Sequence, residues 1–313
     1  MDPLVVLVFV ASALFAWSMG SHYTGAVMGT AYGSGLLSLR KAQILAAAFA
    51  LLGSAVASIN VIHTYANGLV PRASRVDIVA AQFTAAIVTT ISTYFRLPTS
   101  TIQIYTFSLL GAALVGGLPV SGAGFGFVIL FWVAGPLLSV GIGFMLARIG
   151  LGVARREESI LTWFVILVSI YSSFTLGSND VSNAASSLVA LGLLPARLAG
   201  LYGGFFIAVG VLTWGQGLIR RVGHDILRLD VPLAATAQLS QAISLTIINR
   251  LGYNASINQT IVGGLTGTGL AVDRQKLNWS VLRNIVLNWT WSPVLGLSCS
   301  AIMTVIFHSM FAG

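Results

Sequence analysis

One short polar segment, Gly-Ser-Asn-Asp-Val-Ser-Asn-Ala, interrupts apolar sequence at residues 177–184. It contains Asp180, whereas the other acidic residues lie in or beside expected loops. A carboxylate enclosed by apolar sequence is costly, so by default it is a cation ligand, a proton carrier or a counter-ion. Alternatively, Asp180 caps a helix that starts at Val181, and the free N–H groups of that helix start form an anion site. The segment therefore predicts ion chemistry.

The polar segment has a counterpart 157 residues earlier in the chain. Residues 17–42 return as residues 174–199 without a gap, which pairs Gly20 and Ser21 with Gly177 and Ser178. Two later blocks repeat at offsets of 156 and 157, and they pair Ser100 with Ser256, Gln103 with Gln259, Trp132 with Trp289 and Pro136 with Pro293. We interpret the two tryptophans as packing residues. Polar interruptions at equivalent points of two halves are typical of broken transporter helices that meet around a substrate.

Composition identifies the environment in which these polar segments lie. Apolar residues make up 56% of the 313 residues and charged residues 8%, and the mean hydropathy is +0.90. These values predict an all-α polytopic membrane protein, because continuous Ala- and Leu-rich runs do not fit the short alternating strands of a β-barrel. The net charge of +8 comes from residues scattered through loops, which indicates contact with the lipid bilayer and no nucleic acid. The single cysteine, Cys299, excludes an internal disulfide and a CxxC site.

The elements that must position the polar residues follow from the apolar runs. In the first half we expect helices near 3–19, 24–37, 42–66, 77–95, 100–117 and 124–148; in the second half, near 159–176, 181–194, 198–219, 232–249, 256–272 and 280–309. The stretches 24–37, 100–117, 181–194 and 256–272 fall short of the roughly 20 residues of a spanning helix, so they are expected to be half-helices or arms of re-entrant hairpins. We divide the chain into a first repeat (1–147), a basic linker (148–158) and a second repeat (159–313). The first stretch is expected to be a retained helix and not a signal peptide.

Segment 177–184 closely resembles the Gly-Ala-Asn-Asp-Val-Ala-Asn-Ala signature of the inorganic phosphate transporter (PiT) family. The resemblance extends to a Pro-x-Ser-Thr block at Pro98 to Gln103, a worn copy at Asn254 to Gln259, and a late Trp-x-x-x-Pro. It implies two inverted-topology repeats with re-entrant or broken helices that enclose a tetrahedral oxyanion. Carried over by position, the implied substrate-binding residues are Gly20, Ser21, His22, Ser100, Thr101, Gln103, Ser178, Asn179, Asn183, Ser256, Asn258 and Gln259. Asp180 and Asn179 are the expected cation-coupling residues.

The sequence departs from this family pattern at four positions. Where the family carries Asn-Asp in both signatures, the first copy here has His22 and Tyr23, so one of two acidic cation sites is missing. Where the family has His after Ser-Thr-x, this chain has Gln103 and Gln259. The degenerate first signature and the run Met-Gly-Thr-Ala-Tyr-Gly-Ser-Gly resemble the sulfate permease branch, whereas retention of Asp180 is a phosphate-like trait.

The chemistry of the two oxyanions favours sulfate. Phosphate carries a proton near neutral pH and gains from an acceptor, whereas sulfate only accepts hydrogen bonds, so its site should be rich in donors and poor in carboxylates. We therefore expect a secondary active importer of sulfate or thiosulfate, by symport with a proton or sodium, in the plasma membrane. An inorganic phosphate symporter of the same family is the alternative. The sequence contains no catalytic constellation, metal site or cofactor motif, and it leaves open a channel and a homodimer.

Overall fold

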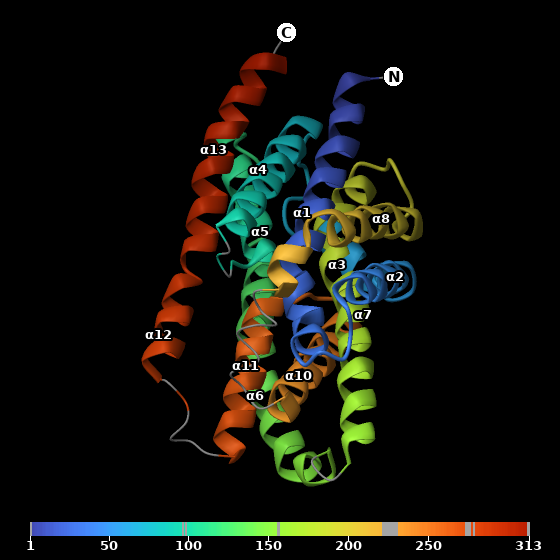
Figure 1. Ribbon diagram of the computed structural model, residues 1–313. Coiled ribbons are helices and arrows are strands. Elements are labelled where there is room, and N and C mark those ends of the chain that lie inside the picture. The colour runs from blue at the N-terminus through green and yellow to red at the C-terminus, as the bar shows by residue number, and fades with distance from the viewer. Residues whose placement is uncertain are drawn as a thin grey trace.

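The computed structural model describes residues 2–95, 97, 99–154, 157–220, 231–272, 277 and 279–311, which form helices joined by loops (Figure 1). Eight helices within these ranges are long and apolar enough to cross a bilayer. They are α1 (Pro3–Gly33), α2 (Leu39–Ala57), α4 (Arg75–Tyr94), α6 (Gly122–Ala154), α7 (Glu158–Ala190), α8 (Ala196–Trp214), α10 (Val231–Arg250) and α13 (Trp291–Phe311). The shorter helices are α3 (Ile59–Gly68), α5 (Thr101–Val115), α11 (Ile257–Val272) and α12 (Trp279–Asn288). The prediction of an all-α polytopic membrane protein is confirmed.

The polar signature segments do not interrupt their helices, which corrects the expected boundaries. The expected stretches 3–19 and 24–37 form one helix, α1, and 159–176 and 181–194 form one helix, α7. Asp180 therefore lies within α7 and caps no helix, so the anion site expected at a helix start near Val181 is also wrong. The continuous helices can bury small polar side chains because these bond back to carbonyls of their own helix, as the Ser21 hydroxyl does to the Ser18 carbonyl at 2.9 Å.

The two short helices expected as hairpin arms are confirmed as short. α5 has 15 residues and α11 has 16, and α5 packs against α4 while α11 packs against α10. Each half thus contains a helical hairpin. We call Leu97, Thr99 and Ser100 the first tip, and residues 251–256 the second tip. Pro98 lies outside the described residues.

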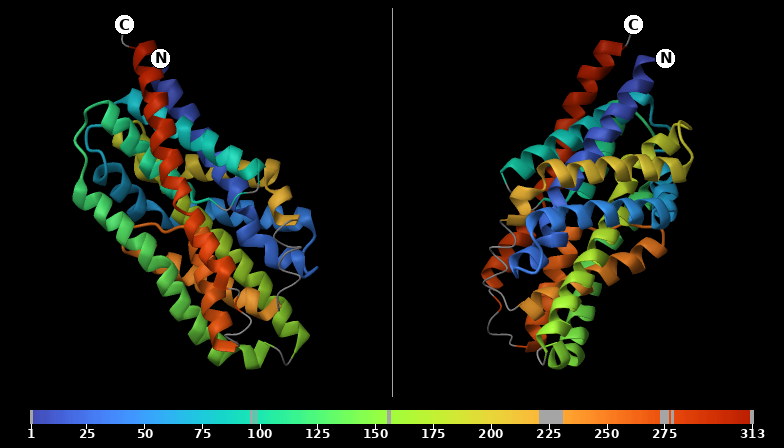
Figure 2. Two further views of the ribbon diagram at one scale, coloured as in Figure 1. Left: turned by 90° about the vertical axis from the view of Figure 1, so that its left-hand side faces the viewer. Right: turned by 45° about the vertical axis from the view of Figure 1, so that its right-hand side comes forward.

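Helices of each half pack against helices of the other half. α1 packs on α8 of the second half, while α7 packs on α2 of the first, and α2 and α8 lie side by side across the longer helices (Figure 2). A Cβ atom on Gly20 would lie 2.0 Å from the Ile207 carbonyl oxygen, and one on Gly177 would lie 1.8 Å from that of Ala50. Only glycine allows backbones to approach this closely. Equivalent glycines therefore fix equivalent contacts in the two inverted repeats.

Three further boundaries differ from those expected. The stretch 198–219 is interrupted at Gly215, where α8 ends. The stretch 42–66 is divided into α2 and α3 at Ser58, and the stretch 280–309 is divided into α12 and α13 at residues 289–290. The hydroxyl of Ser58 donates to the Ser54 carbonyl, which leaves a polar junction in otherwise apolar sequence. The expected linker begins inside α6, which continues to Ala154, and residues 155 and 156 lie outside the described part. The division at 148–158 stays a prediction.

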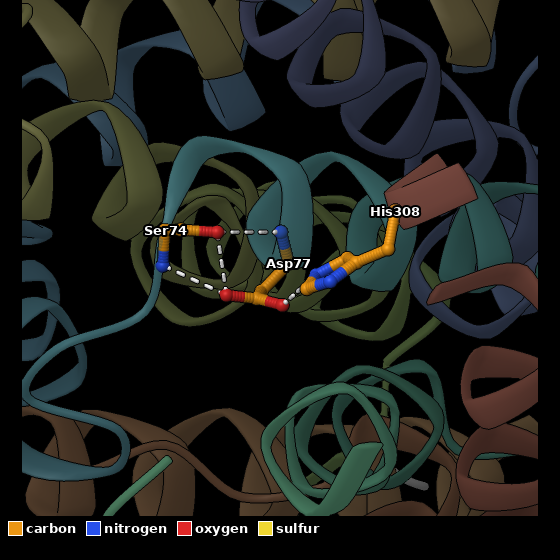
Figure 3. A network of polar contacts seen from close by, with 3 residues as sticks. All are labelled: Ser74, Asp77 and His308. Atoms are coloured by element: carbon orange, nitrogen blue, oxygen red, sulfur yellow. Dashed lines mark hydrogen bonds and ion pairs between the residues drawn. The ribbon is translucent and has the colours of Figure 1, made fainter. Parts of the chain in front are cut away.

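The last helix, α13, contacts the start of α4, the first helix of the first hairpin (Figure 3). Ser74 and Asp77 form a reciprocal capping box at the start of α4, with Ser74 N–H donating to Asp77 Oδ2 at 2.9 Å. The other carboxylate oxygen, Oδ1, lies 2.8 Å from Nε2 of His308 on α13. Both chain ends lie at the same end of the molecule in Figure 1. This contact is therefore remote from the signatures at the centre of α1 and α7.

Candidate functional site

In the second half, Asn179 of α7 joins the signature to the second tip. Its Nδ2 donates to the Ala255 carbonyl at 2.8 Å, and its Oδ1 accepts from Ala255 N–H at 3.1 Å. Asn249, at the end of α10, places its amide 3.1 Å from Ser178 Oγ. In the amide orientation that satisfies its neighbours, Asn249 also donates to Asn179 Oδ1 at 2.9 Å. Asn179 is thus held on both sides by one hairpin. We call this arrangement the second half-site.

In the first half, His22 of α1 occupies the equivalent place. Its Nδ1 lies 2.8 Å from Thr93 Oγ1 and its Nε2 lies 3.2 Å from the Thr99 carbonyl oxygen. His22 pairs with Asn179 at the offset of 157, and Thr93 and Thr99 pair with Asn249 and Ala255 at the offset of 156. This is the first half-site. It has the same plan with an imidazole in place of an amide.

Thr101, in the first turn of α5, bridges the two half-sites. Its hydroxyl lies 3.1 Å from the hydroxyl of Tyr23 and 3.4 Å from Oδ1 of Asp180, while its N–H donates to Tyr23 at 3.1 Å. The other Asp180 oxygen accepts from Asn179 Nδ2 at 2.9 Å. Tyr23 and Asp180 are repeat partners, and both are buried. The two signatures therefore meet at one threonine.

Asparagine side chains form hydrogen bonds between the second hairpin and the first tip, and between the second tip and α7. Asn258 of α11 donates to the Thr99 carbonyl at 2.7 Å, which joins the second hairpin to the first tip. Asn254 of the second tip donates to Asn183 Oδ1 at 2.9 Å and accepts a short hydrogen bond from Tyr65. The predicted residues His22, Thr101, Asn179, Asp180, Asn183 and Asn258 are thus brought into one polar network, and all of them except the partly buried Asn258 are buried. This network is the candidate site.

Among the buried polar atoms that lack a partner within the described part of the chain, three lie in the tips or in the helix turn that follows. They are Oγ of Ser256, beside the start of α11, Oγ1 of Thr99 in the first tip, and Oε1 of Gln103 on α5. Ser256 is 1% exposed, so its hydroxyl is shielded from bulk solvent. Because buried polar groups are nearly always hydrogen-bonded, such atoms are suited to a ligand. The N–H groups at the start of α5 and α11 add further donors.

Several predicted residues have surroundings of a different kind. Gly20 packs on α8, and Ser21 bonds to its own helix. Gln103 and Gln259 line a cavity of about 700 Å³, together with the repeat partners Trp132 and Trp289. Its remaining lining residues are mainly apolar and belong to α6, α11, α12 and α13. Contact of these four predicted residues with substrate stays a prediction.

Two smaller cavities lead to the half-sites from equivalent positions. One, of about 370 Å³, is lined by Thr93 together with Trp214, Gln216 and Arg220. The other, of about 350 Å³, is lined by Asn249 and Ser178 together with Ala57, Ile59 and Arg250. Thr93 and Asn249 are repeat partners, as are Ala57 and Trp214, and Ile59 and Gln216. Each half-site therefore has its own cavity, and each cavity carries one arginine.

Sequence reasoning missed the hairpin residues that hold the signatures. Thr93, Asn249 and Thr99 contact His22 or Asn179, and Tyr65 contacts Asn254. The offset of 156 extended to the end of α4 could have identified Thr93 and Asn249 as a pair. Tyr65 has no such signal, because its contact with Asn254 of the second tip arises from tertiary packing.

Comparison with known proteins identifies the family. The profile described as "Phosphate transporter family" matches residues 19–154 and again 150–304, once for each repeat. The chain belongs to this family. Its members are transporters, so this chain is a multi-pass membrane transporter and not an enzyme.

Relatives with different substrate names cover most of the chain. A Methanocaldococcus jannaschii protein named "Putative phosphate permease" is 27% identical over 93% of this chain and 94% of its own length. The sulfate permease of Bacillus subtilis is 26% identical over 95% of this chain and 86% of its own length. The sodium-dependent phosphate transporter 2 of Bos taurus is 32% identical, over 46% of this chain and 24% of its own length.

A solved structure shares the fold over almost the full chain. It is titled "The sodium-dependent phosphate transporter", has a TM-score of 0.88 and 22% sequence identity, and covers 98% of this chain and all of its own. The likeness confirms the arrangement of two inverted repeats with helical hairpins.

Proposed function

We propose that this transporter imports an inorganic divalent oxyanion, sulfate or thiosulfate in preference to phosphate, across the plasma membrane by symport with a cation. The observation that carries the proposal is the pairing of Asp180 with Tyr23 across Thr101. One carboxylate is present where a symmetric site would have two. A site poor in carboxylates and rich in hydroxyl and amide donors suits an anion that has no proton to donate.

The anion would lie between the tips, near the unpaired Ser256 hydroxyl and the first turns of α5 and α11. Hydroxyls and helix-start N–H groups bind anions without a buried Lys or Arg. Arg220 and Arg250 in the two smaller cavities would attract the anion toward the site. The remaining substrate-binding residues are those that the family signature implies.

The coupling cation would bind at Asp180 and Asn179. A buried carboxylate needs a positive partner, and Asp180 has no Lys or Arg bonded to it within the described residues. Sodium is the first choice, because sodium-dependent transporters are among the relatives. Carboxylate oxygens are ligands that such hard cations prefer, and Asn179 orients this carboxylate by donating from Nδ2 to Oδ2 of Asp180 at 2.9 Å.

Phosphate is the second candidate substrate. The Asp180 carboxylate accepts hydrogen bonds, and the proton of hydrogen phosphate needs an acceptor of this kind. Relatives named for phosphate also match over nearly the whole chain. The alternative differs from the first proposal only in which oxyanion is preferred.

Uptake against a gradient tests active transport. Purified protein in liposomes should accumulate labelled sulfate above the outside concentration when an inward sodium gradient is imposed. Accumulation should collapse when an ionophore dissipates that gradient. A channel would equilibrate sulfate regardless of the gradient. Equilibration without accumulation under an inward sodium gradient, and again under an inward proton gradient, would therefore overturn symport.

A further inference from the structure

The two smaller cavities are related by the internal repeat. Thr93, Trp214, Gln216 and Gly217 line the cavity of about 370 Å³, and their repeat partners Asn249, Ala57, Ile59 and Asn60 line the cavity of about 350 Å³. We call them the first and the second cavity. The first lies at the end of α8 and the second at the end of α2. Agreement at four pairs shows that the cavity belongs to the repeat and not to one half alone.

The two cavities lie toward opposite faces of the membrane. α2 and α8 are both long and apolar enough to span a bilayer, and they pack side by side (Figure 2). They are equivalent helices of two inverted repeats, whose two-fold axis lies in the membrane plane, so their ends face opposite sides. Each cavity is therefore directed toward a different compartment.

The candidate site separates the two cavities. Thr93, which lines the first cavity, lies 2.8 Å from Nδ1 of His22. Asn249, which lines the second cavity, donates to Asn179 at 2.9 Å in the orientation that satisfies its neighbours. The two half-sites meet at Thr101. Polar side chains therefore connect one cavity to the other through the site.

Each cavity has one exposed arginine among its described lining residues, at a position that the repeat does not account for. Arg220 lines the first cavity and Arg250 the second. The repeat partner of Arg220 is His63, and that of Arg250 is Tyr94, so duplication does not explain why each cavity has one. Neither arginine forms an ion pair within the described part of the chain. An unpaired guanidinium in a cavity raises the local concentration of anions.

We infer that the two cavities are the aqueous entrances of the transport route, one at each face of the membrane, and that Arg220 and Arg250 are their anion-attracting residues. The role of the arginines rests on the proposed function, whereas the sidedness of the cavities does not. Each arginine attracts the anion from its own compartment only. Because both side chains are exposed, salt screens this attraction.

The first experiment measures the side from which each cavity is accessible. Gly217→Cys and Asn60→Cys place one cysteine in each cavity at exposed, repeat-related positions, and an added Cβ at Gly217 meets no atom within 4 Å. Both changes are made in Cys299→Ser, which removes the single native cysteine and serves alone as the unlabelled control. A membrane-impermeant maleimide is added to intact cells and to inverted membrane vesicles. One variant should be labelled only in cells and the other only in inverted vesicles.

The second experiment measures the charge effect from each side. Labelled sulfate uptake is followed into cells and into inverted vesicles for Arg220→Gln and Arg250→Gln. Each variant should raise the KM for sulfate about fivefold at low ionic strength from one side only, and the increase should disappear at high ionic strength. Arg197→Gln is the matched control, because Arg197 is exposed and lines neither cavity. Its KM should equal that of the wild type from both sides.

The outcomes separate the inference from the proposed function. Labelling of both cysteines from the same side, or of neither from either side, overturns the assignment of the entrances and needs no transport. An unchanged KM, or an increase of the same size from both sides that persists at high salt, overturns the role of the arginines. Absence of sulfate and phosphate uptake by the wild type overturns the proposed function, while the labelling result still decides where the entrances lie.

Discussion

The two half-sites have one plan and different chemistry. In the second, the Asn179 amide on α7 contacts the second tip; in the first, the His22 imidazole on α1 contacts the first tip. The neighbouring carboxylate of Asp180 and phenol of Tyr23 both contact Thr101. Their hairpin partners are also equivalent, with Asn249 and Ala255 in place of Thr93 and Thr99. Duplication supplies the geometry, and the substitutions on α1 remove one acid. The comparison teaches that a symmetric scaffold can hold a carboxylate in one half and an imidazole and a phenol at the equivalent place in the other.

The largest expected effect is that of replacing Asp180, and it should exceed the effect of replacing its repeat partner Tyr23. Asp180→Asn removes the buried charge while keeping the size of the side chain, and should weaken cation-driven uptake by about 2 to 3 kcal/mol, roughly 30- to 150-fold. Tyr23→Phe loses only a neutral hydroxyl and should cost about 1 kcal/mol, roughly fivefold. Initial rates of labelled sulfate uptake at varied sodium measure both. Wild-type sodium dependence in Asp180→Asn would show that the carboxylate has no coupling role.

The next effect concerns the two glutamines that line the large cavity. Gln103→Leu and Gln259→Leu should each weaken substrate binding by about 1 to 3 kcal/mol if their amides contact the anion. Thr266→Val is the matched control, because Thr266 lines the same cavity but bonds to the Val262 carbonyl of its own helix at 2.8 Å. Competition binding with unlabelled sulfate is the measurement. If all three variants bind alike, the glutamines only line an apolar groove.

A third effect tests whether the repeats are mechanically equivalent. Gly20→Ala and Gly177→Ala each place a Cβ atom against a backbone carbonyl of the other half, so each should lower the stability of the folded protein by about 1 to 3 kcal/mol. Gly141→Ala on α6, where no atom lies within 4 Å of the added Cβ, should lower it by less. Thermal unfolding in detergent compares the three. A large decrease in unfolding temperature for only one of Gly20→Ala and Gly177→Ala would show that the two contacts between the halves are not equivalent.

The smallest effect lies outside both half-sites. His308→Gln weakens the contact between α13 and Asp77 and should cost about 1 kcal/mol or less in stability, because His308 is partly exposed. Sulfate uptake at a fixed sodium gradient should remain at the wild-type rate. A change in the sodium dependence of this variant would show that the end of α13 influences the site.

Sequence patterns predicted much of the architecture and part of the site. Fixed offsets predicted the two repeats, and short apolar runs predicted α5 and α11 as hairpin arms. The polar signature segments led to a wrong prediction of breaks in α1 and α7. Small polar residues occur both at helix breaks and in polar patches on continuous helices, and their types alone do not distinguish the two. Their partners, such as Thr99 and Ala255, contribute backbone carbonyls, which the residue type does not reveal. Tyr65 reaches Asn254 only through tertiary packing.

A competition assay in proteoliposomes with an inward sodium gradient tests the central claim that loss of the first acid favours sulfate. Labelled phosphate and labelled sulfate uptake are each measured against a tenfold excess of the other anion, in wild-type protein and in Tyr23→Asp. We predict that sulfate suppresses phosphate uptake in the wild type, and that Tyr23→Asp, which adds the second carboxylate, penalises sulfate more than phosphate. If tenfold sulfate leaves wild-type phosphate uptake unchanged, the preference for sulfate is contradicted and the phosphate alternative takes its place.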